Sequence, residues 1–420
     1  FDQENTRHQV RVSRADKAAD IDLNWQSGIR YRYGQVRFEG NHLRPGLLDK
    51  LINFEQGKSY SQPQINRLQE SLSKLDYFSS IEIVPDLANK RDGEVPIVVS
   101  VTQGKRTNQN ASVRFGSKTG LGVEYGLERR WLNDRGHKLD FNTSFAQNEQ
   151  GLTALYRIPA FAWLDGWYGI GLTVRNEDYQ TSNSRYGEMF VNRSGEVRNW
   201  DLLASVNVRR ERFDEFIPDI NQAIPFNLYT SVLYPEFNAA WRKSDDPLYP
   251  TSGSAWSYQA RAGYEYETSD APFVQVSVKH KRIIGLDGGH RLLLRAEAGA
   301  IWSDNYDLFP PSLRFYAGGD QSVRGYSYKE IGEYKADLNY GGRYLMVGSV
   351  EYERRLNPEW ALAGFLDVGD AFESSPKANF GLGMGARWRS PIGPVRMDLA
   401  YGFNGPKPGI GIHFAIGAEL

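Results

Sequence analysis

The sequence lacks cysteine, contains only 4 methionines in 420 residues, and has no apolar run that approaches the roughly 18 residues of a membrane-spanning helix. Without cysteine the chain has no disulfides, no thiolate zinc sites and no cysteine nucleophile. Without a long apolar run it has no transmembrane helix. A transmembrane β-barrel stays possible, because its strands alternate apolar and polar residues and are polar on average.

The chain also lacks an excess of either charge, since 50 Lys and Arg residues stand against 51 Asp and Glu residues and leave a formal net charge of -1. Such a chain has no general attraction to phosphate backbones, so nucleic-acid binding is disfavoured. Aromatic residues, in contrast, make up 13% of the chain, and glycine contributes 42 residues. This mixture is typical of twisted strands with aromatic girdles rather than of helix bundles.

Signatures of enzyme active sites are missing from the sequence. The six histidines show no HExxH or other paired ligand spacing, and neither a GxSxG nor a P-loop motif is present. We therefore expect no catalytic activity, no metal site and no cofactor. The alternate glycines of 381–385 superficially suggest a nucleotide loop, but within an amphipathic strand we interpret them as leaving room in a barrel interior.

Residues 29–103 are typical of a small α+β domain. Ser61-Gln-Pro63 resembles a helix N-terminus, and the helix that follows places Ile65, Leu68 and Leu72 on one apolar face that needs a sheet to cover. The predicted order is strand, helix, helix, strand, strand, over residues 31–39, 44–53, 62–75, 79–84 and 95–102.

Residues 1–28 predict only a hairpin, with strands at 9–13 and 19–25 around Asp16 and Lys17. We interpret this segment as the C-terminal remnant of a preceding domain of the same type, and we expect the chain to begin inside a repeat. Residues 1–10 have neither a charged start nor an apolar core, so they do not resemble a leader peptide.

Residues 104–420 lose the helical pattern and alternate instead. In Val395–Phe403 the odd positions are apolar or aromatic, while the even positions include Arg396 and Asp398. Soluble antiparallel sheets alternate as well, but here many rows reach the roughly 9 to 11 residues of a membrane strand. Sixteen such rows fit into the segment, so we predict a mainly β protein with a 16-stranded antiparallel transmembrane β-barrel. Short connections such as 357–359 suit the periplasmic side, and longer ones such as 214–227 and 304–342 suit the outer side.

The segment 304–342 is longer than ordinary loops, and such loops are usually functional or disordered. On composition alone it could be a solvated outer loop in which Arg324 is merely exposed. Alternatively it folds back into the lumen, where burial would require a carboxylate partner for Arg324. Glu351 and Asp367, on rows predicted to face inward, are the candidates.

Two motifs in this region resemble those of a known family, the outer-membrane assembly and two-partner secretion superfamily, in which POTRA domains precede a sixteen-stranded barrel. A VRGY loop motif is met by Val323, Arg324, Gly325 and Tyr326, and an FxDxG strand motif is met by Phe365, Asp367 and Gly369. The resemblance implies that the loop lies in the lumen and that Arg324 pairs with Asp367 and with the neighbouring Glu351. It also implies that 29–103 is the POTRA domain next to the barrel.

Within this family the chain looks most like the barrel subunit of a translocation and assembly module. The resemblance implies a bacterial outer-membrane location with a periplasmic POTRA domain, and contact with outer-membrane lipids. It implies autotransporter-like client proteins and an inner-membrane-anchored periplasmic partner, bound through further POTRA domains. A two-partner secretion pore for one exported protein is the alternative. A passive porin or an outer-membrane enzyme is disfavoured, because neither needs a POTRA domain.

The seam that closes the predicted barrel joins 108–117 to 409–420. Glycine weakens strands and proline removes donors, and Gly405, Pro406 and Pro408 stand just before the last strand. We hypothesise that this seam opens sideways and pairs with an incoming client strand. The other interpretation is that the glycines only accommodate curvature. The candidate seam residues are Asn108, Ser117, Gly409, Gly411, Phe414 and Gly417.

Overall fold

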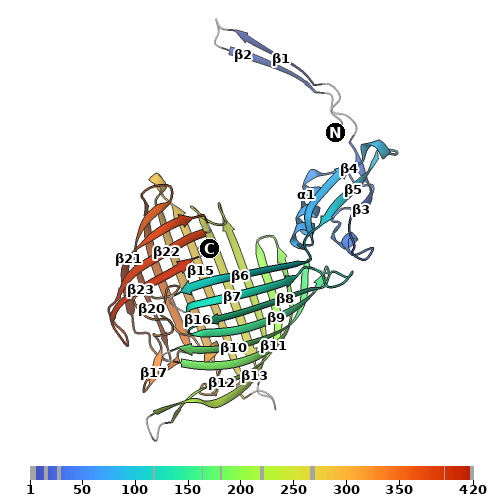
Figure 1. Cartoon of the computed structure of the whole chain (residues 1–420). Coiled ribbons are helices and arrows are strands. Elements are labelled where there is room, and N and C mark those ends of the chain that lie inside the picture. Colours follow the sequence, from blue (N-terminus) through green and yellow to red (C-terminus); the bar gives the residue numbers. More distant parts are fainter. Residues whose placement is uncertain are drawn as a thin grey trace. The chain divides into compact units, whose positions relative to one another are not determined.

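The structure is a computed structural model, shown in Figure 1, and it describes residues 6–13, 18–25, 30–116, 119–162, 164–179, 182–217, 222–264, 270–391 and 393–416. The chain forms two compact units, of which the first holds residues 1–107 together with the turn 130–137, and the second holds 108–129 and 138–420. Among the described residues, no helix is both long and apolar enough to cross a membrane.

The first unit contains an N-terminal hairpin and the small α+β domain. The hairpin pairs β1 (Thr6–Ser13) with β2 (Ala18–Trp25) in antiparallel register, and its predicted turn at Asp16 and Lys17 lies outside the described residues. In the domain, β3 pairs with β5 in parallel and β4 pairs with β5 antiparallel, which gives the order β3-β5-β4. The elements are β3 (Arg32–Glu39), η1 (Leu48–Leu51), α1 (Gln62–Lys74), β4 (Phe78–Pro85), η2 (Leu87–Asn89) and β5 (Glu94–Gln103).

The helix α1 buries Ile65, Leu68 and Leu72, which matches the apolar face expected from their spacing. The predicted helix at 44–53 is wrong, because only the single 3-10 turn η1 forms there. Gly46, which follows Pro45, has a φ of +82°, a left-handed conformation that ends helical geometry before a regular turn can start.

The N-terminus of α1 is capped by a residue outside the helix segment, Tyr33 of β3. The side chain of Ser61 makes no capping hydrogen bond. Instead the hydroxyl of the buried Tyr33, in β3, accepts from Ser61 N at 2.9 Å and donates to Ser61 O at 2.8 Å. The Tyr33 ring stacks on Phe54 at a centroid distance of 3.9 Å, so one side chain joins strand, loop and helix.

The second unit is a sixteen-stranded antiparallel sheet whose order runs without interruption from β23 to β6, and it confirms the predicted fold class of a 16-stranded barrel after a POTRA domain. In Figure 1 the strands curve around a common interior. The strands are β6 (Thr107–Gly116), β7 (Gly120–Arg129), β8 (Lys138–Ala146), β9 (Glu149–Ala160), β10 (Gly166–Tyr179), β11 (Ser182–Val197), β12 (Trp200–Ile217), β13 (Gln222–Ser244), β14 (Gly253–Gly263), β15 (Phe273–Gly285), β16 (Arg291–Trp302), β19 (Tyr344–Arg355), β20 (Trp360–Phe372), β21 (Asn379–Ser390), β22 (Gly393–Gly402) and β23 (Gly409–Ile416).

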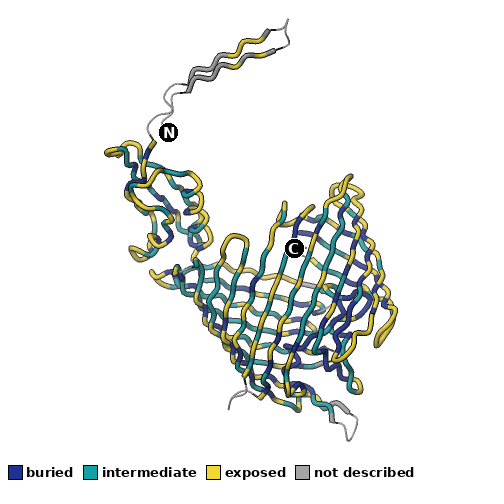
Figure 2. The backbone as a smooth tube through the Cα atoms, turned by 180° about the vertical axis from the view of Figure 1, so that it is seen from behind, coloured by how far each residue is buried: buried dark blue, intermediate teal, exposed yellow. Residues whose placement is uncertain are grey.

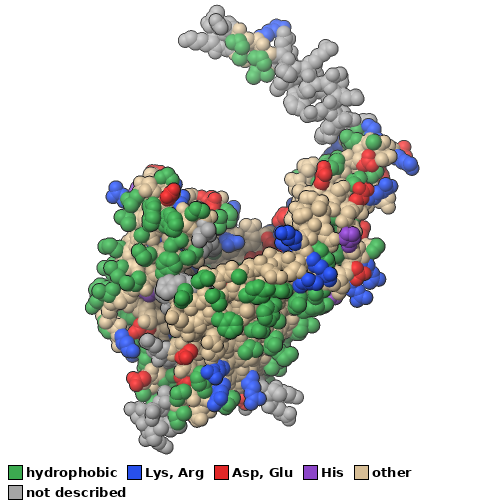
Figure 3. Space-filling model, in the orientation of Figure 1, with side chains coloured by type: hydrophobic (Ala, Val, Ile, Leu, Met, Phe, Trp, Pro, Cys, Tyr) green, Lys and Arg blue, Asp and Glu red, His purple; other side chains and the backbone are tan. Residues whose placement is uncertain are grey.

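The alternation seen in the sequence separates an apolar outer face from a polar interior. On β12, Val206 and Val208 are exposed on the outside, while Asn207 and Arg209, which alternate with them, are buried inside. The tube in Figure 2 shows this alternation of exposed and buried positions along most strands, and Figure 3 shows apolar side chains over the outer wall. Lipid is therefore the natural environment of the outer face.

The predicted long connection at 214–227 is mostly strand. β12 continues to Ile217 and β13 begins at Gln222, with a bulge where the register shifts between Phe213 and Glu215. The notable length of β12 and β13, 18 and 23 residues, exceeds what a bilayer requires, so their outer ends extend beyond the hydrocarbon layer.

The connection between β16 and β19 fills part of the barrel interior. It contains the 3-10 turn η5 (Pro311–Leu313) and a small hairpin of β17 (Glu333–Lys335) and β18 (Leu338–Gly341), which the sequence did not indicate. Phe309, Val323 and Ile331 of this loop are at most 1% exposed. The interpretation of 304–342 as a solvated loop is therefore wrong, and Arg324 itself is 3% exposed.

Candidate functional site in the barrel lumen

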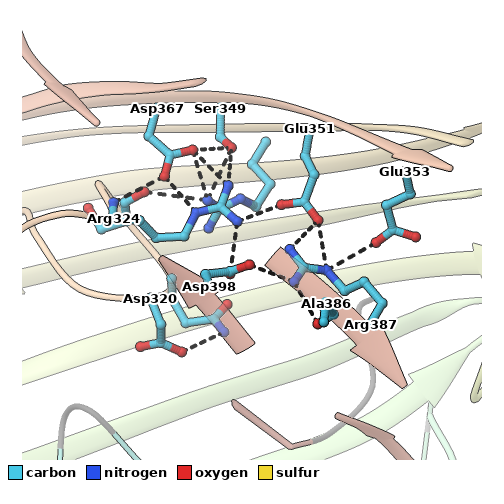
Figure 4. A network of polar contacts seen from close by, with 12 residues as sticks. Asp320, Arg324, Ser349, Glu351, Glu353, Asp367, Ala386, Arg387 and Asp398 are labelled. Carbon is cyan, nitrogen blue, oxygen red and sulfur yellow. Dashed lines mark hydrogen bonds and ion pairs between the residues drawn. The ribbon is translucent and has the colours of Figure 1, made fainter. Parts of the chain in front are cut away.

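The guanidinium of Arg324 forms a bidentate pair with Asp367, a residue of β20 with no exposed surface (Figure 4). Nε lies 2.7 Å from Oδ2 and Nη2 lies 2.9 Å from Oδ1, and the Arg324 backbone N–H also donates to Oδ2 at 3.0 Å. Ser349 of β19 donates to the other carboxylate oxygen at 2.6 Å. Both the side chain and the backbone of the loop are thus fixed by one carboxylate.

Two further carboxylates complete the surroundings of Arg324. Its Nη1 lies 2.6 Å from Glu351 Oε2 and 3.1 Å from Asp398 Oδ2. The guanidinium of Arg387, on β21, pairs with the same two carboxylates, at 2.6 Å from Glu351 Oε1 and 2.6 Å from Asp398 Oδ1. Figure 4 shows these groups converging from β19, β21, β22 and the loop. Buried charges of both signs compensate one another in this network.

The aromatic and small residues of the strand motif pack against the loop motif. The Arg324 guanidinium carbon lies 3.3 Å from the centroid of the Phe365 ring, a cation–π contact. At Gly369, a Cβ atom would lie 3.0 Å from Val323 Cγ2 and 2.9 Å from Met346 O. The structure therefore brings together all residues of the two motifs except Gly325 and Tyr326, which contact other strands.

The loop motif packs closely against glycines of β21, β22 and β23. A Cβ atom on Gly381 would stand 1.9 Å from the carbonyl oxygen of Arg324, and one on Gly402 would stand 2.7 Å from the Tyr326 ring. Gly325 has a φ of +94° and its own Cβ would lie 2.6 Å from Gly402 N. Only glycine allows backbone approaches this close. Of the alternate glycines predicted to leave room, Gly381 leaves it for the loop, whereas Cβ atoms on Gly383 and Gly385 would meet Phe365 and Asp398 of the wall.

The loop motif also contacts the last strand. Gly325 N–H donates to Nε2 of the buried His413 of β23 at 2.9 Å. Gly411, predicted as a seam residue, faces the same glycine, since its Cβ would lie 3.2 Å from Gly325 Cα. Tyr326 donates its hydroxyl proton to the carbonyl of Asn404, in the connection between β22 and β23. His413, Asp398 and Arg387 were not singled out by sequence reasoning, although all three lie on inward rows of the alternation.

Other residues tie the loop to the far side of the barrel. Lys329 Nζ lies 2.9 Å from Glu177 Oε2 of β10, among the rings of Tyr179 and Tyr316 at 5.2 and 5.0 Å. Ser312 N donates to Glu211 of β12 at 3.0 Å. The loop therefore spans the lumen and is held at both ends.

The predicted seam residues lie on the two end strands of the sheet. Asn108 is in β6, and Gly409, Gly411 and Phe414 are in β23. Ser117 and Gly417 lie outside the described residues. Within the described chain, backbone pairing joins each barrel strand to its neighbours in the order but does not join β23 to β6.

The interactions of this site hold the loop 304–342 on the inner face of the barrel wall. Its groups are engaged in ion pairs and hydrogen bonds, and no cluster of His, Asp and Glu in the described part of the chain could hold a metal ion.

Comparison with known proteins gives the family: residues 132–420 match the Omp85 superfamily domain, and residues 31–104 match POTRA, a surface antigen variable number repeat. The chain belongs to the Omp85 superfamily. Like other Omp85 proteins with POTRA domains, it is an outer-membrane β-barrel with its POTRA domain in the periplasm.

Individual relatives place the chain within this superfamily only coarsely. The outer membrane protein assembly factor BamA of Nitratidesulfovibrio vulgaris is 24% identical over 93% of this chain and 51% of its own length. The crystal structure of BamA from Haemophilus ducreyi lacking POTRA domains 1–3 is similar at a TM-score of 0.79, with 16% identity, 99% of this chain and 89% of that chain covered. CdiB from Acinetobacter baumannii gives a TM-score of 0.59, with 15% identity, 98% and 78% covered. The chain thus spans about half the length of the curated BamA relative.

Proposed function

We propose that this Omp85 protein is an outer-membrane assembly factor that inserts or secretes autotransporter-like client proteins through a laterally opening seam between β6 and β23. More specifically, we propose that it acts as a TamA-like barrel subunit, together with an inner-membrane-anchored, TamB-like periplasmic partner bound through further POTRA domains. No chemical step on a substrate belongs to this function, and the name of the N. vulgaris relative is that of an assembly factor.

The observation that carries the proposal is the contact between the lumen loop and the last strand. Gly325 is bonded to His413 of β23, while its neighbour Arg324 is bonded to Asp367 of β20. The loop therefore supports the wall up to its terminal strand, which carries Gly409 and Gly411, residues of low strand propensity, and which is not paired with β6 among the described residues. Because the loop holds β20 to β23 together and β23 has low strand propensity at its outer border, the sheet would open between β23 and β6. A client strand can then pair there by β-augmentation.

A two-partner secretion pore is the second candidate, and the fold similarity to CdiB favours it. The two functions differ in the fate of the client. An assembly factor leaves its client in the membrane as a folded barrel, whereas a secretion pore releases a soluble product on the far side.

The full chain, reconstituted in liposomes, tests this difference. An unfolded autotransporter barrel is added outside, and insertion is measured as a protease-resistant band with heat-modifiable mobility. We expect insertion well above that of liposomes that contain the Arg324→Ala variant in equal, folded amount. Absence of insertion with any client barrel, combined with uptake of an exported soluble protein, would instead support the secretion pore.

A further inference from the structure

Three arginines project from the outside of the barrel wall at the ends of β11 and β12. Arg185, Arg210 and Arg212 are exposed, and they lie on the same outer face as the exposed, apolar Met189 and Val208. In Figure 3, Lys and Arg side chains gather below the apolar band, near the lower ends of the strands labelled β12 and β13 in Figure 1. The lumen network described above is not involved.

Chain connectivity assigns this end of the wall to the outer leaflet. The strand β6 directly follows the periplasmic POTRA domain, so it starts at the periplasmic side. Successive antiparallel strands then place the end of β10, the start of β11 and the end of β12 at the opposite side. The arginines therefore stand at the outer surface of the membrane.

The strand register places the arginines at headgroup depth. Leu172, Met189, Val208 and Leu233 stand side by side across β10 to β13 and form the last outward row that is apolar on all four strands. Arg210 lies two residues beyond that row. Two residues of strand span about 7 Å, close to the depth of one headgroup layer of a bilayer. Arg185 and Arg212 lie two residues further out.

Arg185 and Arg212 are direct cross-strand neighbours, an arrangement that is unfavourable for two cations unless an anion lies between them. Within the described residues, none of the three guanidinium groups forms an ion pair with a carboxylate. Nearby acidic groups are engaged elsewhere or lie further out: Glu215 accepts from Asn227 at 2.6 Å, Asp214 accepts from the backbone of Phe226 at 3.0 Å, and the exposed Asp178 of β10 lies one outward row beyond Arg185.

The guanidinium groups are also oriented in advance. Arg185 donates its Nε–H to Asn176 Oδ1 at 2.6 Å and lies 4.4 Å from the centroid of the Phe226 ring. Arg212 donates its Nε–H to the carbonyl of Phe226 and lies 5.0 Å from the Tyr229 ring. Since Nε serves for positioning, the Nη atoms are left to bind an oxyanion through their fork.

Phe226 itself is held in an unusual conformation. Its φ is +51°, a left-handed value that costs free energy for a residue with a Cβ, and Asp214 at the bulge of β12 holds its N–H. Around the outer ends of β14 to β16, outward positions include apolar and aromatic residues, as at Tyr264, Val274 and Trp302. The cationic cluster is thus a local feature of β11 and β12.

We propose that Arg185, Arg210 and Arg212 form a binding site for the phosphate of a lipid headgroup in the outer leaflet. The apolar row below them contacts the acyl chains of the same lipid, and the ring of Tyr229 lies beside the headgroup. Bound lipid would fix the extended ends of β11 to β13 at the membrane surface.

Binding of a fluorescent, bis-phosphorylated lipid A to the purified full chain in neutral detergent tests the proposal by fluorescence anisotropy. We expect the double variant Arg185→Gln with Arg212→Gln to raise the Kd about tenfold, as the loss of charge-assisted hydrogen bonds implies. The matched control is Arg282→Gln with Arg354→Gln, which removes two outward arginines at the periplasmic end of the wall and should leave the Kd unchanged.

Specificity for lipid is tested with two further probes. Dephosphorylated lipid A should bind wild type about as weakly as phosphorylated lipid A binds the double variant, and inorganic phosphate in tenfold excess should not displace the labelled probe. The proposal is overturned if wild type does not bind the probe, if the control pair loses as much affinity as the test pair, or if inorganic phosphate displaces the lipid. Heat-modifiable mobility of each variant confirms that all barrels compared are folded.

Discussion

The N–H of Gly325 donates to Nε2 of His413 across 2.9 Å, and this bond links the lumen loop to the terminal strand of the barrel. The adjacent Arg324 is fixed on β20 by Asp367. One short stretch of loop therefore spans β20 to β23, and β23 cannot move away from the loop without breaking the bond to His413. The position of β23 is therefore coupled to that of the loop motif.

Replacing His413 tests this link directly. We expect His413→Ala to leave the N–H of Gly325 without an acceptor, which costs about 1–3 kcal/mol of loop docking for a buried group. Hydrogen exchange of residues 320–328 should become about tenfold faster or more. His413→Gln, which offers an amide oxygen, should recover part of the protection. Unchanged exchange in His413→Ala would show that the bond does not hold the loop.

Arg324→Ala should impair client insertion more than barrel folding, because it leaves the fully buried Asp367 without its main cation. Breaking one partner of a buried ion pair costs about 3–5 kcal/mol. Arg324→Lys keeps the charge but loses the bidentate fork, so its activity should lie between those of wild type and Arg324→Ala. Insertion normalised to folded, membrane-embedded protein is the measurement. Wild-type insertion by Arg324→Ala would contradict the anchoring role.

The close packing of the loop on Gly381 predicts that alanine substitutions at two glycines of the wall have different effects on the loop. A Cβ on Gly381 would overlap the Arg324 carbonyl, whereas one on Gly364 of the neighbouring β20 would meet nothing within 4 Å. We expect Gly381→Ala to displace the loop and Gly364→Ala to have no effect. Labelling of a cysteine introduced at Ser322, in the otherwise cysteine-free chain, reports the displacement. Equal labelling in the two variants would argue against close packing of the loop on β21.

The far anchor of the loop gives a further prediction. Glu177→Gln leaves the cation of Lys329 in a pocket that is nearly closed to water, where its side chain is 11% exposed. We expect this variant to lower the thermal stability of the loop more than Glu177→Gln combined with Lys329→Met, which removes both charges. Limited proteolysis of the loop over a temperature series checks the order, and a double variant less stable than the single one would contradict it.

The POTRA domain offers a test that is independent of the barrel. Tyr33→Phe keeps the ring on Phe54 but removes the hydroxyl that caps α1 at Ser61. Loss of a helix cap costs about 1–2 kcal/mol, so hydrogen exchange of the first turn of α1 should accelerate by at least several fold. Tyr60→Phe, which removes a hydroxyl bonded to the exposed Gln62 side chain but not to the Ser61 backbone, is the control and should change exchange in α1 less than Tyr33→Phe does.

The strands and their number could be predicted from the sequence, because a period of two over ten residues is imposed by lipid on one side and polar lumen on the other. In Val395–Gly402 of β22, for example, the positions of Arg396 and Asp398 sufficed to tell the inner face from the outer one. The helix expected at 44–53 failed because one left-handed glycine outweighs favourable local composition. The outer ends of β12 and β13 were missed, since a bulge and long-range pairing override the turn signals there.

Only part of the site could be predicted from the sequence. The inward rows gave Asp367 and Glu351 as candidate partners of Arg324, the resemblance implied the pairing, and the structure places these residues in contact. His413 and Arg387 depend on which inward rows face each other across the lumen, and one sequence does not contain that three-dimensional relation. The alternation indicated that both side chains face inward, but the path of the loop through the lumen could not be predicted from it.

The seam is tested most directly by locking it. Because the chain has no cysteine of its own, cysteine pairs can be introduced along β6 and β23 without background, and a pair that forms a disulfide can be selected. The control pair, Leu399→Cys with Ile412→Cys, joins β22 to β23, which are paired already. We predict that oxidation of the β6–β23 pair abolishes client insertion and reduction restores it, while the control stays active. Undiminished insertion by a fully oxidised β6–β23 lock would contradict lateral opening.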